Sequence, residues 1–306
     1  MLRKPPARDS VEFDEAAADE GAMPKEFVWL CADDYAMSEG VSAGIRKALA
    51  AGRLSATSAM TTRRAWPAAA RALRALGLPS GLGLHLDLTL GPPLGPMPTF
   101  AAQGKLPNVR TVIGGALRGT LALEEIRAEI IRQLDRFEEE FGAPPDFVDG
   151  HQHVHALPGV RSALLEALEQ RPRGRRPWLR DPAERFSRII ARRAEAMKAG
   201  VVAGLAYGFG AQARARGFST NDGFSGFSGF DPKADYGRAF AAYLRATGPR
   251  HLVMCHPGEV DEELTRADPV TWSRPRELGF LLSDDFPKLL NKMGKILAPS
   301  AAFTFS

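Results

Sequence analysis

Cysteine is scarce in this sequence, since Cys31 and Cys255 are the only two among 306 residues. A disulfide framework is therefore excluded, and a reducing compartment, here the cytoplasm, is the expected location. No stretch reaches the roughly 18 consecutive apolar residues of a membrane-spanning helix, so no transmembrane segment is predicted. The formal net charge is only +4, which is too small an excess to predict a nucleic-acid partner.

The remaining composition is that of a globular protein, with 44% hydrophobic and 25% charged residues. A chain of this length can bury a substantial core. Residues 1–24 are acidic and rich in alanine, and they lack the apolar segment of a signal peptide. We therefore expect a flexible N-terminal extension over residues 1–24 and a single domain over residues 25–306.

Strand-like and helical patterns alternate along the chain. The apolar run at residues 26–32 is typical of a strand buried on both faces in a parallel sheet. Residues 123–141 carry an apolar stripe at helical spacing and end at Gly142. This alternation predicts βαβ units with parallel strands, in which functional sites lie at the carboxyl ends of the strands. Further strands are predicted at residues 54–60, 81–90, 145–148, 178–180 and 251–255.

Two adjacent carboxylates, Asp33 and Asp34, follow the first predicted strand. Side by side they repel each other, so a cation or a shared proton has to hold them there. The alternative is a helix cap, but Ser38 is better placed to cap a helix over residues 40–51. We therefore favour a functional role for both aspartates.

Three histidines, His151, His153 and His155, follow the strand at residues 145–148 at intervals of two. They point the same way only if the backbone stays extended. Imidazole is the commonest biological metal ligand, although a stack of hydrogen-bonded polar side chains is the alternative.

Two further histidines, His85 and His256, also lie near strand ends. His85 is on the polar face of the strand at residues 81–90, and inside a barrel that face lines the lumen. His256 directly follows the strand at residues 251–255, and Pro257 then stops the strand. The alternative for His256 is a structural imidazole that donates a hydrogen bond to a loop carbonyl.

Candidate substrate-binding residues follow the histidine cluster. Arg180 ends a predicted strand and is either directed into the cleft or a surface residue. Residues 183–218 hold seven Lys or Arg and two Glu around an apolar patch, which fits either a solvated helix or a surface for a lipidic or anionic ligand. Residues 220–230 are rich in Gly and Phe, as in a flexible loop or in aromatic walls for a sugar ring. The candidates are Arg180, Asn221, Phe224 and His153.

Four motifs together resemble the YdjC-like carbohydrate deacetylases, the family called ChbG/HpnK: Ala32-Asp-Asp-Tyr35, Gly83-Leu-His-Leu-Asp-Leu-Thr89, Asp149-Gly-His-Gln-His-Val-His155 and Met254-Cys-His-Pro-Gly258. The resemblance implies an irregular TIM-like (β/α) barrel and metal-dependent removal of N-acetyl groups from amino sugars by a water that the metal activates. It implies that Asp34, His85 and His151 bind one divalent metal ion, that Asp33 is the general base and that His256 is the general acid. The mixed ligand set does not choose among Mg, Zn, Mn and Co.

Other interpretations stay open at this stage. Within the family, a hopanoid-pathway deacetylase acting on a lipid-linked N-acetylglucosamine is the alternative, because the basic and apolar region 183–218 is similar to that branch. A metallophosphoesterase and a non-catalytic sugar-binding barrel are the alternatives of another class. The partner is expected to be a small amino sugar or its lipid conjugate, with peripheral membrane contact and a homodimer left open.

Overall fold

The computed structural model describes residues 26–77, 81–171, 176–229 and 231–299. The predicted extension at residues 1–24 lies outside this part of the chain. Eight parallel strands form one sheet, and its order β5-β4-β3-β2-β1-β7-β6, with β8 beside β1, matches a TIM-like arrangement. The strands are β1 Glu26–Tyr35, β2 Ala56–Ala59, β3 Gly81–Leu86, β4 Phe147–Gly150, β5 Trp178–Leu179, β6 Gly223–Ser225, β7 His251–Cys255 and β8 Lys295–Leu297.

The sheet comes close to forming a barrel. Leu179 of β5 makes a parallel bridge to Thr220, just ahead of β6, and β6 pairs with β7, which pairs with β1. Because β5 and β6 are very short, this closure is irregular. The predicted irregular TIM-like fold is confirmed, and the parallel strands end at one edge, where the candidate site residues gather.

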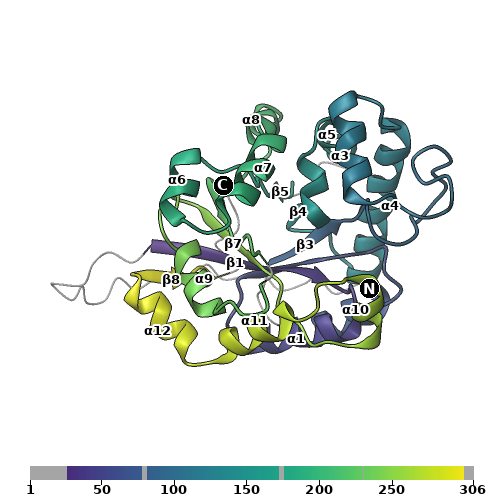
Figure 1. Ribbon diagram of the computed structural model, residues 1–306. Coiled ribbons are helices and arrows are strands. Elements are labelled where there is room, and N and C mark those ends of the chain that lie inside the picture. Colours follow the sequence, from purple (N-terminus) through teal and green to yellow (C-terminus); the bar gives the residue numbers. More distant parts are fainter. Residues whose placement is uncertain (1–25, 78–80, 172–175, 230, 300–306) are drawn as a thin grey trace, which may run out of the picture.

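Helices cover the outside of the strands, and Figure 1 shows α4, α5, α7 and α8 above the sheet and α1, α11 and α12 below it. They are α1 Glu39–Ala50, α2 Trp66–Ala75, α3 Val109–Arg118, α4 Leu123–Phe141, α5 Val160–Glu169, α6 Phe186–Arg192, α7 Ala196–Leu205, α8 Phe209–Ala215, α9 Tyr236–Tyr243, α10 Glu262–Ala267, α11 Ser273–Leu282 and α12 Asp285–Lys292. Among the described helices, none is long and apolar enough to cross a bilayer.

Local sequence signals set several helix ends. The Ser38 side chain accepts a hydrogen bond from the backbone N–H of Val41 at 3.2 Å and caps α1, as predicted. Gly142 ends α4 with φ 82°, a left-handed conformation that suits glycine. The apolar stripe of α4 is buried through Ile126, Ile130, Leu134 and Phe137, and it packs on the sheet and on α2 and α5.

The strand predicted from Gly81 ends earlier than its pattern indicates, and the chain after β4 does not stay extended. β3 ends at Leu86 because the Asp87 carboxylate accepts hydrogen bonds from the N–H groups of Thr89 and Leu90 and forms a tight turn. After β4 the chain enters a short 3₁₀ helix, His151–Ala156, with positive φ at Gln152 and His153. The extended backbone needed for three imidazoles to point the same way is therefore absent, and the three side chains diverge.

Candidate active site

A cavity of about 420 Å³ opens at the carboxyl ends of β1, β3, β4 and β7. Its volume falls within the roughly 300 to 1,000 Å³ of small-molecule sites. Six of the predicted site residues line it, so the barrel brings together side chains separated by more than two hundred positions. They are Asp33, Asp34, His85, His151, His153 and His256, and other lining residues include Val109, Lys198, Val202, Asp268 and Arg274.

A β-bulge places the two aspartates. Between the pairs Ala32–Thr57 and Tyr35–Ala59, β1 has two residues where β2 has one, and Asp34 takes φ 68°. In a regular strand, neighbouring side chains point to opposite faces. The extra residue and the left-handed conformation let both carboxylates line the same cavity, a strained arrangement typical of functional sites.

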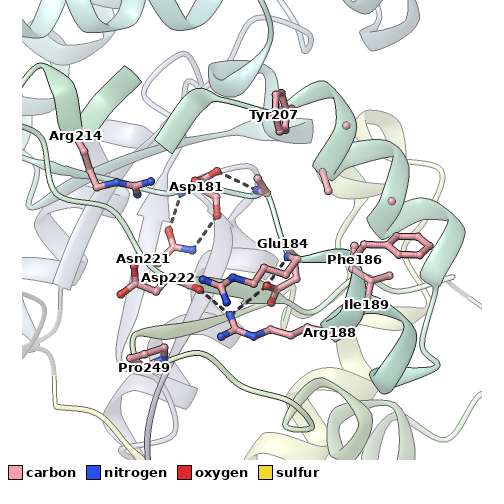
Figure 2. Close-up of a pocket in the computed structure, with 15 residues that line it drawn as sticks. Asp181, Glu184, Phe186, Arg188, Ile189, Tyr207, Arg214, Asn221, Asp222 and Pro249 are labelled. Atoms are coloured by element: carbon pink, nitrogen blue, oxygen red, sulfur yellow. Dashed lines mark hydrogen bonds and ion pairs between the residues drawn. The ribbon is translucent and has the colours of Figure 1, made fainter. Parts of the chain in front are cut away.

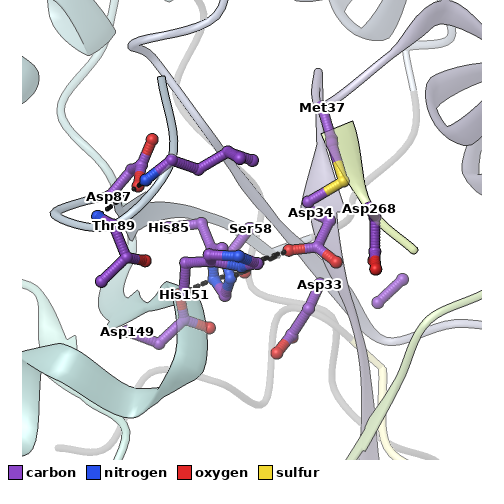
Figure 3. A network of polar contacts seen from close by, with 12 residues as sticks. Asp33, Asp34, Met37, Ser58, His85, Asp87, Thr89, Asp149, His151 and Asp268 are labelled. Carbon is purple, nitrogen blue, oxygen red and sulfur yellow. Dashed lines mark hydrogen bonds and ion pairs between the residues drawn. The ribbon is translucent and has the colours of Figure 1, made fainter. Parts of the chain in front are cut away.

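Asp34, His85 and His151 converge at one point, with one ligand atom from each within 4.8 Å of the others. The Oδ1 atom of Asp34 lies 3.2 Å from His85 Nε2 and 3.0 Å from His151 Nδ1 (Figure 3). One carboxylate and two imidazoles on one side of an open cavity are a donor set that suits a divalent ion. The geometry therefore supports the predicted ligand set.

Asp149 and Ser58 orient the imidazole of His85 through its Nδ1 atom. Its Nδ1 atom lies 2.7 Å from Asp149 Oδ1 and 3.0 Å from the hydroxyl of Ser58. Burial by itself would lower the pKa of His85, but Asp149, Asp34 and Asp33 raise it to about 10. Because Nδ1 faces Asp149 and Ser58, Nε2 is the atom that faces Asp34. A carboxylate behind a histidine ligand commonly orients metal-binding imidazoles.

Arg180 holds Asp33 through both of its terminal nitrogens. Nη1 and Nη2 each lie 2.6 Å from an Asp33 oxygen, and Nη2 is also 2.5 Å from Asp149. Burial would raise the pKa of Asp33, but the guanidinium outweighs it and lowers the pKa to about 2. Asp33 is therefore ionised at neutral pH, with its orientation fixed.

A second group of potential metal ligands consists of Cys31, Asp33 and Asp149. Here Arg180 already supplies the positive charge, and burial raises the pKa of the Cys31 thiol well above its usual value. This group therefore fits an arginine-bridged carboxylate pair better than an ion site.

His256 lines the same cavity directly after β7, and the pairing of Ala32 with Cys255 between β1 and β7 places it next to Asp33. Its backbone N–H donates to Glu277 Oε2 at 2.6 Å. Glu277 is buried, and burial raises its pKa while the nearby His256 opposes that shift.

The four candidate substrate-binding residues occupy different places. His153 lines the cavity, and its ring contacts Phe224 and Phe227 edge-on, with 5.6 Å between ring centroids in each case. Phe224 is completely buried and packs between His153 and Arg180, while Arg180 lies behind Asp33. Asn221 is hydrogen-bonded to the backbone of Asp181 and lines a separate cavity. Of these four, only His153 is among the described residues that line the catalytic cavity.

The YdjC-like protein family matches residues 27–292, which include all these site residues. The chain belongs to this family. A crystal structure of a protein assigned to cellobiose-phosphate cleavage, from Enterococcus faecalis V583, has a TM-score of 0.70 and 20% identity, with 91% of this chain and 98% of that chain covered. At this identity the likeness shows the fold alone.

Curated relatives of this YdjC-like chain are deacetylases. A carbohydrate deacetylase of Mus musculus is 33% identical over 195 residues, which are 57% of this chain and 61% of that protein. Chitooligosaccharide deacetylases of Enterobacter sp. (strain 638) and Serratia marcescens are 41% and 40% identical over 130 and 141 residues, covering 42% and 45% of this chain and 50% and 54% of theirs. The chain thus spans about half to three fifths of the length of these relatives.

The sequence analysis missed three polar residues that complete the site in this YdjC-like chain. Asp149 lies opposite His85 in the β3–β4 register. Arg274 on α11 is buried, and its Nη2 atom lies 2.7 Å from Asp34 Oδ2. Glu277, one turn further along α11, contacts His256. The sequence signal for the α11 pair was an Arg and a Glu at i and i+3, which places both on one helix face.

Proposed function

We propose that this YdjC-like protein hydrolyses the N-acetyl group of an amino sugar or its conjugate, in a reaction that depends on one divalent metal ion. The observation that carries the proposal is the convergence of Asp34, His85 and His151 beside Asp33, with His256 lining the same cavity. The deacetylase names of the curated relatives support the reaction class. The proposed location remains the cytoplasm.

The chain's own residues fit the metal that this reaction needs. Asp34, His85 and His151 would hold the ion, and their ligand atoms already lie within 4.8 Å of one another. A bound divalent ion would make water more acidic and would polarise the acetyl carbonyl. Arg274 fixes the second oxygen of Asp34, which leaves Oδ1 directed at the histidines.

Asp33 is the proposed general base. It stands next to Asp34 on the bulge, it is ionised at neutral pH, and Arg180 fixes both of its oxygens. Each carboxylate oxygen keeps a further lone pair for a water molecule. Asp33 would orient this water and accept its proton as the oxygen attacks the acetyl carbon.

His256 is the proposed general acid. The amine of an amide is a poor leaving group until its nitrogen gains a proton. The imidazole of His256, which lines the same cavity and whose backbone N–H donates to Glu277, would supply that proton. His153 and Lys198 line the same space and are proposed to contact the sugar.

A lipid-linked N-acetylglucosamine, as in the hopanoid pathway, is a second candidate substrate. One observation favours it: Lys198 and Val202 of α7 line the catalytic cavity, while Met197 and Val201 of the same helix are exposed. An apolar aglycone leaving the cavity along α7 would meet an apolar surface.

Acetate release tests the function. The protein, freed of metal and then supplied separately with Mg, Zn, Mn or Co, is offered diacetylchitobiose, an N-acetylglucosamine glycolipid and nitrophenyl phosphate. We expect metal-dependent acetate release from at least one amino sugar and no phosphate release. Phosphate release without acetate would favour a metallophosphoesterase, whereas binding without turnover would favour a sugar-binding barrel.

A further inference from the structure

The helices α6 and α7 expose large apolar side chains to solvent. Phe186 is 72% exposed, Met197 84% and Tyr207 83%, and Ile190 and Val201 are each more than half exposed. We call this set, Phe186, Ile190, Met197, Val201 and Tyr207, the α6–α7 face. Phe186 and Ile190 are four residues apart on α6, as are Met197 and Val201 on α7, so each pair shares one side of its helix. Exposed apolar surface of this kind typically marks an interaction site.

The helix α7 is apolar on nearly all sides, yet it lies at the surface. Ala199 is its only fully buried residue. A side chain added at Gly200 or Gly204 would meet no other atom within 4 Å. Helices that are apolar all round are normally buried in protein or lipid. In α7, Ala196, Val202 and Ala203 pack on the core, whereas Met197 and Val201 face solvent.

The surroundings of the α6–α7 face are positively charged. Residues 183–218 hold seven Lys or Arg and two Glu. One of the two, Glu184, is already neutralised by Arg188 and Arg192 at 3.3 and 2.6 Å. Arg185 and Arg193 are exposed beside the apolar side chains. The charge of this region therefore complements an anionic partner.

A second cavity, of about 820 Å³, lies within the same region (Figure 2). Phe186, Ile189 and Tyr207 form its apolar part, and Arg185 and Arg214 are among its basic residues. Three carboxylates also line it: Glu184 is paired with Arg188 and Arg192, Asp222 is paired with Arg250 at 2.6 Å, and Asp181 lies near Arg214. Apolar walls next to arginines suit a phosphate headgroup with the start of its acyl chains.

We propose that the α6–α7 face docks on the surface of an anionic phospholipid bilayer. A helix pair with exposed apolar side chains and flanking arginines is typical of proteins that lie in the interface of a membrane. A second copy of this chain is the less suitable partner, because a two-fold interface would bring the same positive surplus against itself. The proposal is independent of the proposed deacetylation, although α7 would place the bilayer next to the catalytic cavity.

Vesicle sedimentation tests the proposal with the full chain. Vesicles of phosphatidylcholine with phosphatidylglycerol are compared with vesicles of phosphatidylcholine alone, at low and high salt. We expect binding to the anionic vesicles that weakens with salt. The double variant Met197→Asp/Val201→Asp should abolish it, whereas Leu117→Asp, which alters an equally exposed leucine on α3, should not.

Charge reversal gives a second measurement. Arg185→Glu with Arg193→Glu should weaken binding by roughly fivefold or more for each residue changed, whereas Arg71→Glu on α2 should leave it unchanged. Circular dichroism should show that every variant is folded. Equal binding to neutral and anionic vesicles, or no binding at low salt, would overturn the proposal. A dimer in sedimentation velocity that Met197→Asp/Val201→Asp dissociates would assign the face to a second copy instead.

Discussion

Two cavities among the described residues, the catalytic cavity and the second cavity, differ in how their charges are held. Around the catalytic cavity, Asp33 and Asp34 are buried, and each is paired with an arginine from another element, Arg180 or Arg274. At the second cavity and the adjacent α6–α7 face, Arg185 and Arg193 are exposed, and large apolar side chains face solvent. The first arrangement fixes the orientation of the two carboxylates, whereas the second leaves basic and apolar side chains accessible to a binding partner.

Buried and exposed ion pairs also differ in how strongly their removal changes the free energy of unfolding. Removing one partner of a buried ion pair typically costs roughly 3 to 5 kcal/mol, because the other charge stays buried without compensation. Exposed pairs contribute only about 0 to 1 kcal/mol. A substitution in the catalytic network should therefore alter chemistry or folding strongly, whereas one at the second cavity should alter binding or pH dependence more gently.

The largest effect is expected from the proposed metal ligands. His151→Ala or His85→Ala should lose the divalent ion, because two remaining protein ligands do not offset the desolvation of the ion. Acetate release should fall to background. Metal content measured on the purified variants checks this, with His153→Ala as a matched control that lines the same cavity. Full metal occupancy in either ligand variant would contradict the assignment.

The adjacent aspartates should differ from each other. Asp33→Asn should keep the metal and lower turnover by roughly 10² to 10⁴, the usual contribution of a general base. Asp34→Asn should weaken metal binding instead, because it removes the carboxylate that faces both histidines. Metal titrations of both variants separate the roles, and urea unfolding shows whether the loss of charge next to Arg180 also destabilises the fold. Equal metal loss in both would mean that the pair binds jointly.

The loss of activity caused by removing the His256 imidazole should depend on the leaving group of the substrate. His256→Ala should hydrolyse an N-acetyl substrate poorly, by about 10² or more, yet retain much more activity on an acetyl ester with a good leaving group, which departs without a proton. Metal content should stay unchanged. Rates on the amide and the ester, compared as ratios to the unchanged protein, give the answer. The same fractional loss on both would favour simple substrate binding by the imidazole.

The alternation of strands and helices predicted much of this fold. Apolar runs ending in Asp33-Asp34 and in His256 placed these residues at the carboxyl edge of a parallel sheet, and the structure agrees. What the pattern lacked was the local backbone. The bulge at Asp34 and the left-handed Gln152 and His153 depend on packing across strands, which periodicity does not describe.

Ion pairs between residues far apart in the chain also could not be predicted from the sequence. From the sequence, Arg180 was either directed into the cleft or a surface residue, whereas in the structure it is buried behind Asp33 and bridges it to Asp149. Arg274 is 240 positions from Asp34 in the chain. Each arginine reads locally as a surface residue, because nothing near it in sequence reveals a buried carboxylate partner. Only the closure of the sheet brings the charges together.

The smallest effect is expected at Asp181, which lines the second cavity. Burial raises the pKa of Asp181 from 3.8 to about 6, despite hydrogen bonding to Ala183 and the nearby Arg214. Because the folded pKa lies above the unfolded one, this carboxyl favours folding most below about pH 4, and that contribution is lost as the pH rises through 6.

Asp181→Asn should therefore be more stable than the unchanged protein at pH 8, by up to about 3 kcal/mol, with a smaller gain in stability at pH 5. Asp222→Asn, in the same cavity but with a side chain that is 35% exposed and paired with Arg250, should change stability little at either pH. Urea unfolding at the two pH values measures the difference, and an Asp181→Asn gain that does not grow with pH would show that this carboxyl is not the source.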